Sequence, residues 1–154
     1  MHLTRLSALA ALMMLSGFAS AEVRVEGPVE YGVFEGPKAA LQSGERVLRR
    51  SNENIEQTEI VPARLGTKFG LRYQLAGKVA EDVPLTLLYF TPGIRTPDGQ
   101  RHDKLEVTQK LVPGAPQDIM AYEFTESHEV IPGEWCFMVF QGDRLLVQQR
   151  FTVR

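Results

Sequence analysis

Hydrophobic and polar residues alternate with a period of two along much of this chain. The clearest stretch is 68–75, where Phe69, Leu71, Tyr73 and Leu75 occupy every second position and polar or small residues lie between them. Because successive side chains of a β-strand point to opposite faces, this pattern predicts a strand with one buried and one solvated face. Weaker runs of the same kind predict strands at 29–34, 55–61, 105–111 and 119–124.

Two other stretches depart from this alternation. Residues 85–90 are apolar on both faces, which predicts a central strand and the best candidate for the core. Residues 38–50 have poor apolar spacing and are interrupted by Gly44, so we expect a loop there.

The C-terminal segment predicts a β-hairpin, with strands 134–141 and 144–153 around a tight turn at Gly142-Asp143. Two registers fit. A two-residue turn pairs Phe140 with Leu145 and Met138 with Val147. A shift of the pairing by one residue instead aligns an apolar face of the first strand with an apolar face of the second. The first face consists of Trp135, Phe137 and Val139, and the second includes Val147 and Phe151.

Turn signals separate the predicted strands at short intervals, and no long amphipathic helix lies between them. This organisation favours an all-β, antiparallel β-sandwich or barrel over a parallel sheet with helical crossovers. We expect an immunoglobulin-like sandwich of about seven to nine strands. The clearest signals are Gly27-Pro28, Gly36-Pro37, Pro92-Gly93, Pro97-Asp98-Gly99, Pro113-Gly114 and Pro132-Gly133.

The first 21 residues predict a secretory signal peptide. A positive leader at 1–5 precedes an apolar stretch at 6–18, and Ala19-Ser20-Ala21 fits the small-residue rule for cleavage. Removal of these 21 residues from 154 leaves 133, a suitable size for one domain at 22–154. We therefore expect a periplasmic or secreted protein with no integral membrane span in the mature chain.

The charge of the chain argues against some classes of binding partner, and its cysteine content decides whether an internal disulfide can form. The formal net charge is −2, with the two signs interleaved, which argues against nucleic acid or anionic membrane as the main partner. The basic cluster Arg46, Arg49 and Arg50 is flanked by acidic residues, as in a solvated edge strand or loop. The single cysteine, Cys136, precludes an internal disulfide, and its apolar neighbours predict a buried, inert thiol.

Two patches of sequence carry a family resemblance. The succession Pro132-Gly133, Trp135, Gly142-Asp143 and Phe151-Thr152-Val153 resembles the last two strands of bacterial immunoglobulin-like sandwiches. The segments 55–58, 60–63 and 65–70 look like a functionally uncharacterised family of small exported bacterial proteins, a domain of unknown function. The resemblance implies a sandwich fold but no particular role, since such sandwiches serve many functions.

Candidate chemistry is sparse. Ser127-His128-Glu129 are sequence neighbours, but neighbours in an extended segment point to opposite faces and cannot form a catalytic relay among themselves. His102, Asp103 and His128 are weak metal-ligand candidates, because their spacing matches no ligand signature; exposed loop histidines are the favoured interpretation. We predict no catalytic residue, no cofactor and no metal.

The stretch 91–103 is the predicted working surface. It is the longest turn-rich region between confident strands, and it presents Ile94, Arg95 and Arg101 as candidate partner contacts. A plain connector between strands is the alternative interpretation.

The sequence as a whole therefore predicts an exported, non-enzymatic β-sandwich that acts as a binding or accessory module of the cell envelope. Its partner would be an envelope protein or a glycan, and the protein would be a monomer or a weak dimer. A lipocalin-like barrel with a ligand cavity is the main alternative, disfavoured by an aromatic content of 8%. A metal-binding periplasmic protein is the less favoured one.

Overall fold

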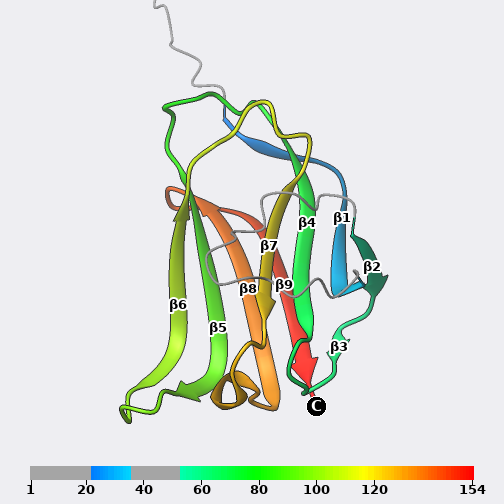
Figure 1. The fold of residues 1–154 in the computed structure, drawn as a ribbon. Helices are drawn as coiled ribbons and strands as arrows, with labels where there is room; N and C mark the ends of the chain where they lie inside the picture. The colour runs from blue at the N-terminus through cyan, green and yellow to red at the C-terminus, as the bar shows by residue number, and fades with distance from the viewer. Residues whose placement is uncertain (1–21, 36–52) are drawn as a thin grey trace, which may run out of the picture.

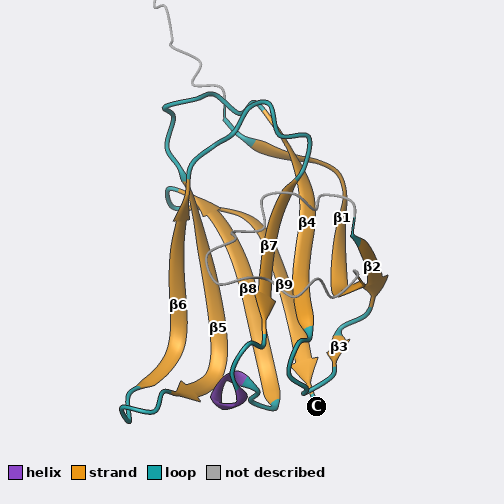
Figure 2. Ribbon diagram, in the orientation of Figure 1, coloured by secondary structure: helices purple, strands orange, loops and turns teal. Residues whose placement is uncertain are grey.

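The computed structural model describes residues 22–35 and 53–154, which form two β-sheets packed face to face (Figures 1 and 2). Sheet A has the strand order β2-β1-β4-β7, and sheet B the order β3-β9-β8-β5-β6. All pairs are antiparallel except β3 with β9. The strands are β1 (Arg24–Glu35), β2 (Asn54–Gln57), β3 (Ile60–Val61), β4 (Lys68–Ala76), β5 (Leu85–Arg95), β6 (Arg101–Gln109), β7 (Asp118–Glu123), β8 (Gly133–Gln141) and β9 (Arg144–Val153), with one 3-10 turn, η1 (Ser127–Glu129).

The described residues form nine strands in two open sheets, which confirms the predicted all-β sandwich. A lipocalin-like barrel is not what the chain forms, because the sheets remain separate and aromatic side chains fill the space between them. No helix in the described part of the chain has the length and hydropathy of a membrane span. The predicted signal peptide, the loop 38–50 and the cluster Arg46, Arg49 and Arg50 lie outside the described residues.

Phe69 lies at the centre of the core and is fully buried. Its ring centroid is 5.2 to 5.5 Å from four others, a spacing typical of favourable aromatic pairs. Three of these rings come from sheet B and one follows β7, so Phe69 joins the two sheets. The four partners are Phe124, Trp135, Phe137 and Phe151. The alternation at 68–75 is thus confirmed in β4.

The predicted strand 55–61 is wrong as a single element. The chain leaves sheet A after β2 and enters sheet B at β3, where Ile60 and Val61 pair with β9. Thr58 turns the chain: its hydroxyl accepts a hydrogen bond from the Ile60 N–H at 3.0 Å. Both short strands are extended, so periodicity alone does not reveal the change of sheet.

The predicted loop 91–103 is also wrong in its bounds. Strand β5 continues to Arg95 through a bulge between Phe90 and Ile94, and only residues 96–100 connect it to β6. The Thr91 hydroxyl donates to the His102 carbonyl at 2.8 Å and accepts from the Gly93 N–H at 3.1 Å. These bonds hold the bulge together where Pro92 has no N–H to donate.

The C-terminal hairpin forms as predicted and uses both candidate registers. Phe140 pairs with Leu145 next to the turn, whereas Val139 pairs with Val147. The strand with the extra residue is β9, in which Leu146 lies between these two pairs. Beyond it the second register continues and places Trp135 opposite Phe151, both on the buried face.

Candidate functional site

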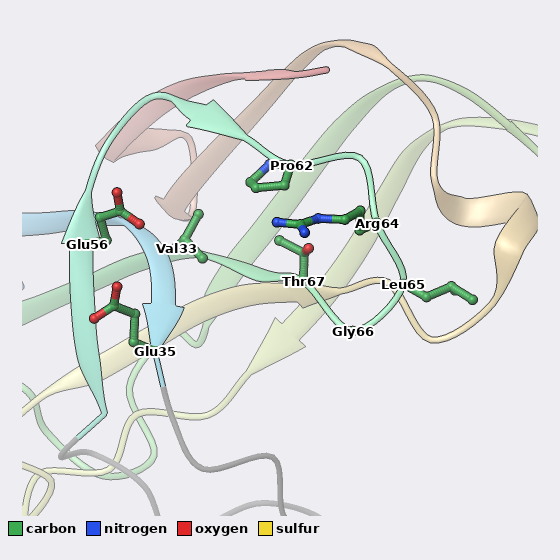
Figure 3. A pocket seen from close by; sticks show the side chains of 8 residues that line it. All are labelled: Val33, Glu35, Glu56, Pro62, Arg64, Leu65, Gly66 and Thr67. Atoms are coloured by element: carbon green, nitrogen blue, oxygen red, sulfur yellow. The ribbon is translucent and has the colours of Figure 1, made fainter.

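An open cleft of about 300 Å³ lies where the chain crosses from sheet A to sheet B (Figure 3). One wall comes from the ends of β1 and β2, and the other from the segment between β3 and β4. The lining residues are Val33, Glu35, Glu56, Pro62, Arg64, Leu65, Gly66 and Thr67.

Backbone hydrogen bonds fix the segment between β3 and β4. The Arg64 N–H donates to the Pro62 carbonyl at 2.9 Å, and the Thr67 N–H donates to the Arg64 carbonyl at 3.2 Å. The Gly66 N–H reaches the Phe124 carbonyl at 2.7 Å, beyond the end of β7. Gly66 has a φ of +83°, a conformation that favours glycine. The loop is therefore anchored to the sandwich and presents its side chains from a fixed base.

Charges of both signs face each other across the cleft. Figure 3 shows Glu35 and Glu56 on the wall made by β1 and β2, and the Arg64 side chain extending toward them from the opposite loop. None of the three forms an ion pair with another residue in the described ranges. Within the part of the chain that the structure describes, the cleft thus presents charges of both signs that no ion pair neutralises.

Apolar surface accompanies the charged groups. Val33 and Pro62 line the cleft, whereas the Leu65 side chain points away from it into solvent and is 56% exposed. The cleft thus combines apolar and charged lining groups, and an exposed leucine lies beside its arginine.

The three predicted partner contacts do not share one surface. Ile94 is 4% exposed and belongs to the core, so the prediction that it contacts a partner fails. Arg95 and Arg101 are exposed and are paired across β5 and β6. The Arg101 guanidinium donates to the Pro92 carbonyl at 3.2 Å and covers Gly93, so it is partly engaged by the bulge.

The weak metal candidates are not assembled. His102 and Asp103 lie on β6, and His128 lies in η1, where its Nδ1 is 3.3 Å from a Glu126 carboxylate oxygen. In the ranges 22–35 and 53–154, no three His, Cys, Asp or Glu side chains gather in a way that could hold a metal ion.

Glu129 of the Ser127-His128-Glu129 triplet has a structural role. Its carboxylate accepts hydrogen bonds from the Tyr122 hydroxyl, from the Thr125 hydroxyl and N–H, and from the Glu126 N–H. Burial raises the pKa of Glu129, but these hydrogen bonds outweigh burial and hold the pKa below 4.5. The carboxylate stabilises η1 and its link to β7.

Cys136 differs from the predicted buried thiol. It lies on the outward face of β8 and is half-buried, with its sulfur 3.7 Å from the Gln148 amide nitrogen. The reason is the register: Trp135 and Phe137 take the buried positions, so the residue between them points outward.

Sequence reasoning did not identify the charged cleft residues Glu35, Glu56 and Arg64. A signal was available, because most of the cleft falls within or beside the segments 55–58, 60–63 and 65–70 that carried the family resemblance. The convergence of Glu35 with this region depends on the pairing of β1 with β2, which the sequence alone did not show.

Comparisons with known proteins agree with the fold. The family described as "Domain of unknown function (DUF3859)" matches residues 22–153. An immunoglobulin-like protein from Pseudomonas aeruginosa, known from a crystal structure, is similar, with 65% sequence identity and a TM-score of 0.78. The match covers 88% of this chain and 99% of that one and confirms the predicted immunoglobulin-like sandwich. No curated protein matches the sequence.

Proposed function

This chain belongs to the DUF3859 family, whose function is unknown, and on that premise we propose that it is an exported binding module of the cell envelope that works without catalysis. Its partner is a segment of an envelope protein that carries both positive and negative groups and docks in the cleft between the β1 and β2 wall and the loop before β4. The single observation that carries the proposal is the set of charges across this cleft, formed by Arg64, Glu35 and Glu56, which have no ion-pair partner among the described residues.

Export is supported by the position at which the folded domain begins. The family match starts at Glu22, the residue after the predicted cleavage site. Val23 is fully buried, and its carbonyl accepts a 2.5 Å hydrogen bond from the Arg144 guanidinium. The chain thus enters the core immediately after Ala21, which suits a signal peptide 1–21 and a single domain 22–154 in the periplasm or outside the cell.

A role without catalysis is supported by several acidic and phenolic groups whose pKa is shifted and whose hydrogen bonds hold the sandwich together. The Glu30 carboxylate bonds Arg72, and Glu129 bonds Tyr122. Burial raises the pKa of Tyr89 to about 12, and its hydroxyl donates to the Ala121 carbonyl at 3.1 Å. Each of these groups fastens one element of the sandwich to another, which favours a structural origin for the shifts.

A test begins with protein recovered from its exported compartment and examined by native mass spectrometry. We expect a complex with a second polypeptide at fixed stoichiometry. Arg64→Glu places a third negative charge in the cleft and should abolish the complex, whereas Arg24→Glu, an exposed change on β1 outside the cleft, should leave it intact. Equal binding by both variants would remove the cleft from the proposal, and a bound metal at fixed stoichiometry would contradict the proposed role.

A further inference from the structure

Strand β6 forms a long open edge. Within the described residues it pairs with β5 alone, and its nine residues, Arg101–Gln109, contain neither proline nor glycine. Figure 1 shows it at the outer side of sheet B. Unpaired backbone groups along such an edge can bond another strand, and the charged side chains that the edge carries limit which strand it can accept.

The other edges are less suited to pairing. Strands β2 and β3 have four and two residues, respectively. Strand β7 has six residues, three fewer than β6. Among the edges in the described ranges, β6 therefore offers the longest run of backbone for pairing.

We propose that β6 pairs antiparallel with β6 of a second copy of this chain, about a two-fold axis at Leu105. In this register Lys104 of each copy lies opposite Glu106 of the other, which gives two cross-strand pairs of opposite charge. The two Leu105 side chains face each other on the axis. The remaining pairs contain no like charges: Arg101 with Gln109, His102 with Thr108, and Asp103 with Val107.

Charge also selects this register over its neighbours. A two-fold axis normal to the sheet keeps each residue on the same face in both copies, so the axis must pass through a residue and not between two. Moving the axis to residue 104 places Lys104 opposite its own copy, and moving it to residue 106 does the same for Glu106. Both moves create like-charge contacts, whereas the axis at Leu105 does not.

The exposed apolar surface of β6 fits a second copy as well. Leu105 packs against the core and Val107 is 46% exposed, and they pair with the inward-facing Tyr89 and Leu87 of β5. A second β6 would cover this edge and extend the five strands of sheet B into one sheet of ten. Because a single strand pair gives a small interface, the dimer is weak and depends on concentration and salt.

Charge reversal tests the proposal by sedimentation equilibrium of the exported protein. Either Lys104→Glu or Glu106→Lys alone places like charges opposite each other at two symmetry-related positions. We therefore expect the dissociation constant of the dimer to rise about tenfold or more. The double variant K104E/E106K exchanges the two charges, and its dimer should have a dissociation constant within about threefold of that of the unchanged protein. Lys110→Glu makes the same charge change just beyond β6 and should have little effect.

The outcomes separate cleanly. A protein that stays monomeric up to millimolar concentration overturns the proposal, and so does a dimer that ignores the single reversals or is not restored by the double exchange. Failure here leaves the cleft proposal intact, since β6 contributes no residue to the cleft.

Disulfide formation tests the register independently. In a Cys136→Ser background, Leu105→Cys places two thiols on the axis at the Cα separation that a disulfide spans, and oxidation should give a covalent dimer. Gln109→Cys places the thiols far apart, because residue 109 lies opposite residue 101, and this variant should remain monomeric in non-reducing electrophoresis. A covalent dimer of the Gln109→Cys variant, or none of the Leu105→Cys variant, overturns the register.

Discussion

Lys78 and Asp118 form a salt bridge that is almost completely removed from solvent. The Lys78 Nζ is 3.1 Å from Oδ2 of Asp118, and each side chain is 5% exposed. The same ammonium donates to the Ala115 carbonyl at 2.7 Å, so it links the loop after β4 to the loop before β7. Tyr73, which pairs with Asp118 across the two strands, has a buried hydroxyl without a hydrogen-bond partner in the described structure. Burial, and after it the negative charge of Asp118, raises the pKa of the Tyr73 hydroxyl.

Removal of the lysine should destabilise the fold strongly. Lys78→Met leaves the Asp118 carboxylate buried without its cation, and we expect a loss of about 3–5 kcal/mol in the free energy of unfolding by urea. Lys110→Met, at an exposed lysine, should change it by less than about 0.5 kcal/mol. The double variant Lys78→Met with Asp118→Leu should recover much of the loss, and a lysine variant as stable as the parent would show that the pair carries no such coupling.

Acid should weaken the hydrogen bonds by which the Glu129 carboxylate stabilises η1. Because its folded pKa is below 4.5, the carboxylate stabilises the fold above about that pH, and this stabilisation is lost as pH falls through the folded value. Glu129→Gln should therefore lose about 1 kcal/mol or more at pH 7 and become closer to the parent as the medium is acidified. Urea unfolding of both proteins at several pH values measures the difference, and a difference constant with pH would contradict the assignment.

Gly70 should be intolerant of any side chain. It lies in the middle of β4 with a φ of +156°, and a Cβ there would be 2.1 Å from the Met120 carbonyl oxygen of β7. Gly70→Ala must therefore separate the two strands or distort the backbone, and we expect a loss of about 3 kcal/mol or more by thermal or urea unfolding. Gly114 has open space around its Cβ position, and Gly114→Ala serves as the matched control with little change.

The segment 91–103 should separate into core and surface positions. Ile94→Ala removes a side chain that is 4% exposed and should lower the unfolding free energy by about 2–5 kcal/mol. Arg95→Ala, at the next and exposed residue, should be nearly neutral. Comparable stability of the two variants would mean that Ile94 does not support the core.

The hairpin shows how far the sequence leads. Glycine and aspartate at 142–143, between two apolar runs, were enough to predict β8, β9 and their turn. The register could not be predicted, because the bulge at Leu146 allows one alignment at the turn and the other beyond it. Extra residues of this kind respond to packing against the opposite sheet, a non-local contact that periodicity does not contain.

The cleft was hidden for a related reason. Arg64 and Glu56 come together only because the chain changes sheets between them, and the alternation across 55–61 concealed that change. Conversely, the turn signal Pro92-Gly93 marked a bulge inside β5, where proline and glycine are also tolerated. Local sequence signals thus located most of the strands. The cleft, in contrast, depended on pairings between segments that lie far apart in the sequence.

Site-specific photo-cross-linking in living cells tests the binding role most directly. A photoreactive residue at Leu65, beside the cleft, should capture one discrete polypeptide, and Arg64→Glu in the same chain should abolish that product. The same residue at Val112, which is similarly exposed at 52% but lies in the loop between β6 and β7 at the other end of the sandwich, should capture little (Figure 1). Equal capture at both positions, or a product at Leu65 that is unaffected by the Arg64 change, would contradict a partner docked in the cleft.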